Sequence, residues 1–151
     1  CDYNFIFTNI QADRTGFVHG LIQPQMATQG TPFWWLAQFG LTNDFDLAED
    51  SDTDSDGMRA IEEYLAGTLP TNNGSVFRII SQGQIDGTNY IQWLGGTTGP
   101  SNPYGIYIST NLSSGIWTLT ANVSRIDGTN IWWSTSQLHY PTYFYRISAT
   151  N

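Results

Sequence analysis

The stretch Asp52-Thr-Asp54-Ser-Asp56-Gly57, followed by Glu63, decides how this chain is interpreted. Carboxylates at alternate positions, a glycine at the sixth position and a glutamate at the twelfth match the EF-hand calcium loop. Calcium takes about six to eight oxygen ligands at about 2.3–2.6 Å, and alternate side chains converge when a loop of this kind curls at its glycine. The spacing therefore predicts a calcium-binding loop.

The remaining loop positions complete the predicted ligand set. Met58 offers its backbone carbonyl at the seventh position, a water serves at Ala60 in the ninth, and Glu63 binds with both oxygens. The predicted ligands are thus Asp52, Asp54, Asp56, Met58 and Glu63. Mg²⁺ is disfavoured because it demands a tighter octahedron, and zinc and copper are disfavoured by hard oxygen ligands. The alternative is a solvated acidic loop that binds no ion.

Charge is concentrated around this loop. Of the 13 acidic residues, nine lie between positions 44 and 63, where Arg59 is the one base, and the chain carries a net charge of −8. Such a block repels itself and favours the open chain unless something neutralises it. Asp46, Glu49 and Asp50 could supply a second ion or outer contacts to the first.

Composition excludes several function classes. The 151 residues allow one domain or two small ones, and all 5 basic residues are arginines. A chain without lysine has neither a Walker-type phosphate site nor Schiff-base chemistry, and an acidic chain is a poor partner for nucleic acid. No nucleophile elbow, catalytic triad spacing or phosphate loop is present, so we expect a protein that is not an enzyme.

Export is the expected localisation. No apolar run approaches the length of a membrane span, and no signal peptide is visible, so we expect a mature or trimmed product. The 1 cysteine, Cys1, cannot form an internal disulfide, and its chemical state is left open. Together with the abundant Asn, Thr, Ser and Gly, this pattern favours a secreted, extracellular or cell-surface bacterial protein.

Start and stop signals predict short helices before the calcium loop and after it. Thr31 is the expected N-cap with Pro32 at the first helical position, and Gly40 ends a helix over 33–39. A helical turn is expected over 45–48, and a further helix over 58–66 ends at Gly67.

From position 75 the pattern changes to short strands separated by turn residues. The predicted strands are 76–82, 89–94, 104–110, 117–122, 130–136 and 143–149. Their spacing predicts an antiparallel β-sandwich in a mostly β protein with the calcium loop as a short helical insert. Ile85-Asp-Gly and Ile126-Asp-Gly each precede an aromatic strand, and both are expected to be tight hairpin turns.

The N-terminal residues predict a β-hairpin whose strands cover 3–10 and 15–22. The aromatic residues of its faces are Tyr3, Phe5, Phe7 and Phe17. An isolated hairpin is marginal in water, so it is expected to add to another sheet, as strand exchange between subunits does. The chain thus divides into a hairpin segment (1–29), a helix–calcium loop–helix segment (30–74) and a β-sandwich (75–151).

Residues 31–45, 52–58 and 63–72 together resemble a module near the C-terminus of large secreted proteins of environmental bacteria. The calcium loop resembles those of dockerins and thrombospondin type 3 repeats. The sandwich that ends such proteins is resembled by residues 75–79, 107–112 and 144–147. Residues 3–14 resemble the end of a bacterial surface repeat. The resemblance implies an exported, calcium-stabilised, non-catalytic region with the same five ligands. Leu69-Pro70 departs from the usual Asp-Pro, and the surface repeat would lack its earlier strands.

Three function hypotheses follow, of which the third is an accessory domain of an enzyme. The first is an extracellular calcium-stabilised structural protein, a surface or filament subunit joined to other copies of itself by β-strand addition. The alternative is a carbohydrate-binding or surface-anchoring module of a larger secreted protein, in which Trp132 and Trp133 are candidates for stacking on glycans. Adjacent strand residues face opposite ways, so at most one of the two tryptophans is expected in the core.

Overall fold

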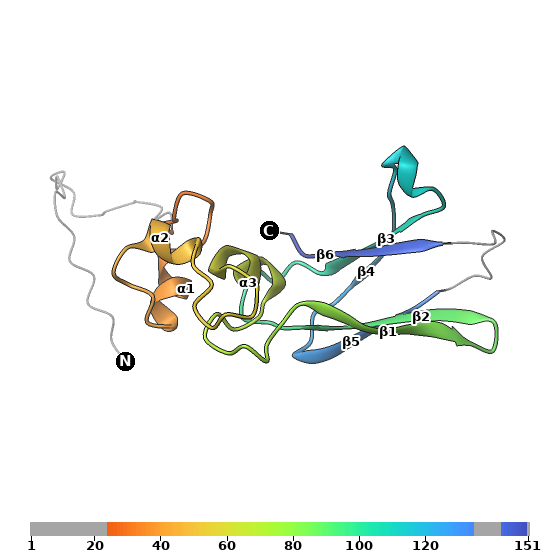
Figure 1. Cartoon of the computed structure of the whole chain (residues 1–151), viewed down its shortest axis with the longest axis horizontal. Coiled ribbons are helices and arrows are strands. Elements are labelled where there is room, and N and C mark those ends of the chain that lie inside the picture. Colours follow the sequence, from red (N-terminus) through yellow and green to blue (C-terminus); the bar gives the residue numbers. More distant parts are fainter. Residues whose placement is uncertain (1–23, 135–142, 151) are drawn as a thin grey trace, which may run out of the picture.

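All six predicted strands are present, and they form two separate antiparallel sheets (Figure 1). The structure is a computed structural model that describes residues 24–134 and 143–150. The strands are β1 (Arg78–Ile85), β2 (Thr88–Gly95), β3 (Tyr104–Ser109), β4 (Thr118–Val123), β5 (Gly128–Trp133) and β6 (Phe144–Ser148), with a 3-10 turn at Leu112–Ser114. One sheet has the order β1-β2-β5 and the other β4-β3-β6. The chain is therefore mostly β, as the sequence predicts.

The two sheets share one hydrophobic core. Ile91 and Trp93 of β2 and Tyr104 and Ile106 of β3 are buried and form one cluster. The alternation of strand side chains places these residues on the inner faces, and it leaves their neighbours in sequence on the outer faces. Burial of large aromatic side chains from both sheets is what holds the sheets together.

Only the first of the two Asp-Gly repeats forms a hairpin turn. Asp86 and Gly87 connect β1 to β2 with φ of 49° and 77°, the left-handed pair that a two-residue hairpin requires. The second prediction is wrong, because β4 and β5 belong to different sheets and Asp127 lies in the connection between them. Its carboxylate accepts hydrogen bonds from the backbone N–H and the hydroxyl of Thr97 instead.

Three short helices precede the sheets and have a core of their own. They are α1 (Phe33–Gln38), α2 (Phe45–Glu49) and α3 (Ala60–Ala66). The buried residues of their cluster are Ala27, Trp35, Leu36, Ala60, Ile61 and Tyr64. Ala27 belongs to the segment predicted as a strand-exchange hairpin, and the described part of that segment packs on the helices. Within the described residues, no helix has the length and apolar character needed to cross a bilayer.

The helix boundaries differ slightly from those that the sequence predicts. Pro32 occupies the N-cap position of α1, with no side-chain cap, whereas Thr31 was the expected cap. The helix α3 begins two residues later than expected, at Ala60, and the backbone N–H of Arg59 donates to the Glu62 side chain at 2.8 Å. Its end agrees with the prediction, because Gly67 adopts the left-handed conformation with φ of 75°.

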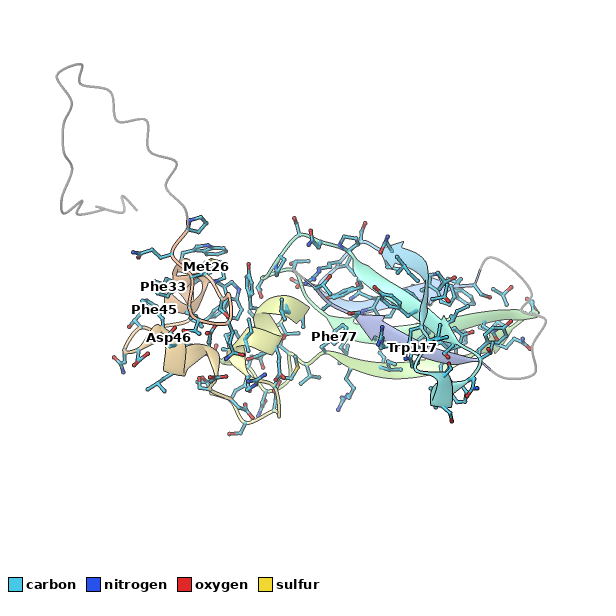
Figure 2. The ribbon with its side chains drawn as sticks, turned by 90° about the horizontal axis from the view of Figure 1, so that it is seen from above. Met26, Phe33, Phe45, Asp46, Phe77 and Trp117 are labelled. Atoms are coloured by element: carbon cyan, nitrogen blue, oxygen red, sulfur yellow. The ribbon has the colours of Figure 1, made fainter. Side chains whose placement is uncertain are left out.

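Hydrogen bonds tie the helices to the sheets. The indole of Trp35 donates to the carbonyl of Thr98 at 2.8 Å, and the hydroxyl of Tyr104 donates to the carbonyl of Ala66 at 2.7 Å. The guanidinium of Arg125 stacks on the ring of Tyr104. Figure 2 shows Met26, Phe33 and Phe45 at the helical end and Phe77 between the helices and the sheets. The end of α3 is therefore in direct hydrogen-bonded contact with the sheet core.

Candidate metal site

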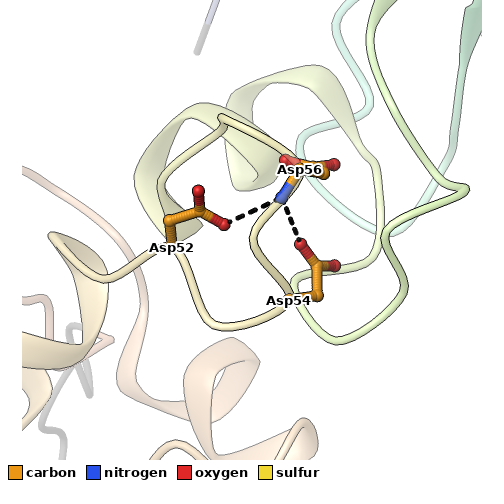
Figure 3. A group of neighbouring side chains, drawn as sticks. All are labelled: Asp52, Asp54 and Asp56. Carbon is orange, nitrogen blue, oxygen red and sulfur yellow. Dashed lines mark hydrogen bonds between the residues drawn. The ribbon is translucent and has the colours of Figure 1, made fainter.

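The predicted ligands lie in the loop between α2 and α3, and the backbone there brings three aspartates together (Figure 3). One carboxylate oxygen from each of Asp52, Asp54 and Asp56 lies within 4.8 Å of the other two. Asp52 is exposed, whereas Asp54 and Asp56 are half-buried. Three negative charges at this spacing repel one another, so a cation would lower the energy of the arrangement.

The loop curls because its own backbone N–H groups donate to these carboxylates. The N–H of Asp56 donates to Asp52 at 3.2 Å and to Asp54 at 3.3 Å, and the N–H of Gly57 donates to Asp52 at 3.0 Å. The curl requires left-handed backbone at Ser55 and Gly57, with φ of 64° and 97°. Gly57 adopts such a conformation without strain, which is the physical reason for a glycine at this position.

Glu63 lies on the buried face of α3, outside the group of three whose oxygens converge within 4.8 Å, but close enough for the charges of the aspartates to act on it. It is fully buried, and neither of its carboxylate oxygens has a hydrogen-bond partner among the described residues. Burial, followed by the negative charges of Asp54, Asp56 and Asp52, raises the pKa of Glu63 from 4.5 to about 8. The Thr68 hydroxyl lies near enough to lower that pKa weakly, but its geometry is not that of a hydrogen bond.

Among the described residues, the buried carboxylate oxygens without a hydrogen-bond partner all belong to this loop and to Glu63. The second carboxylate oxygens of Asp54 and Asp56 are buried without hydrogen bonds, as are both oxygens of Glu63. A buried carboxylate without a partner is costly, and paired charges or metal ions are the usual compensation. Because all four atoms are hard oxygen donors, the residues fit a hard divalent cation of the calcium type.

The other acids of the segment have protein partners. Glu49 is fully buried and accepts hydrogen bonds from the backbone N–H groups of Gln29 at 2.6 Å and Thr31 at 3.2 Å. The remaining contacts are Asp44 with the first turn of α2, Asp46 with the N–H of Thr28, and Asp50 and Glu62 with Arg59. A second ion at Asp46, Glu49 and Asp50 is therefore unnecessary, since these carboxylates bind the chain itself.

Glu49 is the residue whose role sequence reasoning missed. Its partners lie 18 and 20 residues earlier in the chain. A local motif search cannot find such a contact. The only signal was a glutamate in the last turn of a short helix, where a negative charge is unfavourable to the helix dipole unless a tertiary contact compensates.

Met58 connects the loop to the sheets. Its N–H donates to the carboxylate of Asp56 at 2.7 Å, and its sulfur accepts a hydrogen bond from the N–H of Phe77 at 3.3 Å. The coordination by its backbone carbonyl stays a prediction. The sulfur contact places the loop directly against the segment that leads into β1.

The two tryptophans proposed for glycan stacking lie on opposite faces of β5. Trp132 packs against the core between the sheets, with its ring 5.9 Å from that of Tyr145. Trp133 is 41% exposed on the outer face, and its ring lies 5.2 Å from that of Tyr90. Only Trp133 is therefore available to a ligand outside the sheets.

The residues predicted for assembly lie outside the residues that the structure describes, and they are Tyr3, Phe5, Phe7 and Phe17.

Comparison with known proteins adds nothing to the assignment of these residues. No protein-family model, no curated protein and no solved structure matches this chain. The function of this chain is therefore inferred from its own residues.

Proposed function

We propose that this chain is an extracellular structural protein stabilised by one calcium ion, and that copies of it assemble by β-strand addition. The ion is held by Asp52, Asp54, Asp56 and Glu63 together with the backbone carbonyl of Met58. In this proposal the two sheets form a β-sandwich, and the helical segment is an EF-hand-like insert that the ion makes compact. No step of this function is catalytic.

The observation that carries the proposal is the set of four buried carboxylate oxygens without partners on Asp54, Asp56 and Glu63. In the same segment every other acid has a protein partner, so the unpaired charge is specific to the loop. A dication at this place supplies the missing partner for all of these oxygens at once. Calcium is preferred over magnesium because it accepts more ligands and an irregular geometry.

The role we assign to the ion is structural because the loop leads directly into the junction with the sheets. Glu63 is on the same helix as Ala66, whose carbonyl accepts the hydrogen bond from Tyr104 in the sheet core. Binding of calcium to the folded state alone stabilises that state. Extracellular EF-hand modules bind calcium with dissociation constants of about 10⁻⁴–10⁻³ M. A loop with an affinity as low as this would therefore still bind calcium outside cells.

Calcium titration of the metal-free chain tests this function. We expect saturable binding of one ion by calorimetry and little response to magnesium at the same concentration. At a calcium concentration 100 times the dissociation constant, the folded state gains about 2.7 kcal/mol, which raises the thermal midpoint by roughly 5–10 °C. An equal midpoint in calcium and in chelator contradicts the proposal.

The alternative function, a carbohydrate-binding or surface-anchoring module, is favoured by one observation. The exposed ring of Trp133 lies next to that of Tyr90 on the outer face of β2 and β5. The Tyr90 ring also lies against Gly83, where an added Cβ would lie 3.1 Å from the ring atoms. Binding to a glycan array that is lost in the Trp133→Ala variant would support this alternative.

A further inference from the structure

We propose that the free edge of β6, with the cavity beside it, accepts residues 3–8 of a second copy of the chain as an added β-strand. This inference rests on the assembly step of the proposed function and names the surface that the step uses. Both the edge and the cavity belong to the described residues, and the incoming segment is identified by its sequence pattern.

The cavity opens between β1 and β6, which are end strands of their sheets. It has a volume of about 470 Å³, and it is lined by Phe77, Ile79, Trp93, Tyr145 and Ile147 together with the two arginines Arg78 and Arg146. In the orders β1-β2-β5 and β4-β3-β6, each of these two strands has a neighbour on one side only among residues 24–134 and 143–150. The core is therefore open along this side, where apolar side chains line a space large enough for a ligand.

One buried donor in this lining has no acceptor. Trp93 is fully buried, and its indole N–H makes no hydrogen bond. A buried tryptophan N–H usually finds a partner, and the loss costs about 1–3 kcal/mol when it does not. A side chain with a hydroxyl group that enters the cavity, as Tyr3 has, would supply the kind of acceptor that this N–H lacks.

Of the two end strands, β6 is better suited than β1 to pair with an added strand. The β1–β2 ladder has a register shift between Ile79 and Ser81, and such irregularities twist an edge away from added strands. The pairing of β3 with β6 has no shift over its whole length. The one charged side chain of β6, Arg146, is held over the rings of Tyr107 and Trp117, at 4.8 and 5.0 Å from their centroids.

The sequence of residues 3–8 suits this edge. Tyr3, Phe5 and Phe7 alternate with other residues, and the segment carries no charge. Added to β6, a strand with this alternation presents its aromatic side chains to the apolar cavity. Burial of these rings against Phe77 and Ile79 would provide the hydrophobic part of the contact.

The position of the described N-terminal part favours a second copy over the same chain. Met26 lies at the helical end of the molecule, whereas β6 lies in the sheet half (Figures 1 and 2). A contact from one helical end to the next sheet edge is head-to-tail. Such heterologous contacts repeat without closing and generate filaments unless the rotation closes a ring.

Photo-crosslinking from Cys1 tests the inference on the full chain. A benzophenone is attached to this cysteine in normal-isotope protein, which is mixed in millimolar calcium with ¹⁵N-labelled protein carrying Cys1→Ser. After irradiation, mass spectrometry separates crosslinks between copies, which join light to heavy peptides, from those within one copy. We expect light-to-heavy crosslinks on residues 143–150 and on the cavity lining.

A matched pair of lysine variants identifies the surface. Ile79 lies at the cavity and is 45% exposed, and Ile131 lies outside it on β5 and is 38% exposed. Ile79→Lys should reduce the light-to-heavy crosslink by about tenfold or more, because the strand would bury an unpaired ammonium. Ile131→Lys should leave the crosslink unchanged. Should Ile79→Lys fail to fold, excess free peptide of residues 2–9 should compete in the wild-type protein, and a scrambled peptide should not.

The outcomes separate this inference from the function on which it rests. Light-to-heavy crosslinks on other strand edges overturn the β6 assignment while assembly stands. Crosslinks within one copy alone overturn the choice of a second copy. A chain that sediments as a monomer in calcium overturns the assembly step itself, together with this inference, while the calcium titration decides the metal site independently.

Discussion

The helical segment, residues 24–74, and the sheet segment, residues 75–150, are each held together by a buried aromatic core, but they differ in net charge. Each has its own buried cluster around large aromatic residues, Trp35 and Tyr64 in the first, Trp93 and Tyr104 in the second. The helical segment carries 9 acids and 1 base, a balance of −8, whereas the sheet segment has 2 acids and 3 bases, a balance of +1. Repulsion between like charges therefore opposes folding in the first segment far more than in the second.

The comparison indicates where a cation would stabilise the folded state and where it would have no such role. Among the described residues, the sheet segment gains its stability from side chains packed between two hydrogen-bonded sheets. In the helical segment the helices have five to seven residues, too few to be stable in isolation. Their packing brings four carboxylates into the same region of the fold. The electrostatic repulsion among these carboxylates destabilises the folded state unless an ion binds. The predictions below vary the charge, the junction and the surface in turn.

The largest effect is expected for Glu63→Gln, and its sign should depend on calcium. In calcium the variant loses a charged ligand, and at a calcium concentration 100 times the dissociation constant the free energy of unfolding should fall by up to about 2.7 kcal/mol, the whole stabilisation that the ion supplies. In chelator the same variant should be more stable than the wild type, because glutamine avoids the cost of protonating or burying this carboxylate. Urea unfolding under both conditions measures the two effects.

Glu62→Gln is the matched control for that variant. Glu62 is adjacent in sequence and half exposed, and it pairs with Arg59 on the surface. Its substitution should change the free energy of unfolding by less than about 1 kcal/mol in either condition. Equal effects of the two variants would show that Glu63 has no special relation to a cation.

A pH dependence should accompany the metal-free state. The pKa of Glu63 is raised from 4.5 to about 8 in the folded chain. The unfolded chain therefore releases this proton first, and the free energy of unfolding should fall as the pH rises from about 4.5 to about 8. Calcium should abolish this fall, since it binds the deprotonated carboxylate. Chemical unfolding across this pH range measures it, and an equal fall in Glu63→Gln would contradict the assignment.

The junction between the segments is tested by two glycine substitutions. Gly67 and Gly40 have nearly the same φ, 75° and 76°, but an added Cβ at Gly67 would lie 2.4 Å from the carbonyl oxygen of Gly96, whereas Gly40 faces open space. Gly40→Ala should cost about 1–2 kcal/mol from backbone strain alone. Gly67→Ala should cost at least about 1 kcal/mol more, because the helix must move away from the sheets. Equal losses in denaturant unfolding would mean that the junction is loose.

The smallest effect is expected at the outer face of the sheets. Trp133→Ala removes a half-exposed ring and its contact with Tyr90, and the free energy of unfolding should fall by about 0.5–1.5 kcal/mol. Trp34 on α1 is 57% exposed, and Trp34→Ala is the matched control in the helical segment. Glycan-array binding should be unchanged in both variants, and a loss confined to Trp133→Ala would shift the account toward the carbohydrate-binding alternative.

Local signals predicted the elements of this fold, and contacts between distant residues decided the rest. Strands β1 to β6 were expected within a few residues, since alternation and turn residues are read locally. The sequence did not show that β4 and β5 belong to different sheets, so Asp127 was assigned to a hairpin turn. Likewise the spacing of Asp52, Asp54 and Asp56 predicted their convergence, whereas the partners of Glu49 are distant in sequence and required the structure.

Hydrogen exchange with mass spectrometry, in calcium and in chelator, tests the central claim most directly. The account predicts that amides of the loop and α3, residues 52–66, lose most of their protection when calcium is removed, while amides of β2 and β3 keep theirs. Protection of residues 52–66 that is identical with and without calcium would contradict it, because the acidic segment would then be compact without any ion.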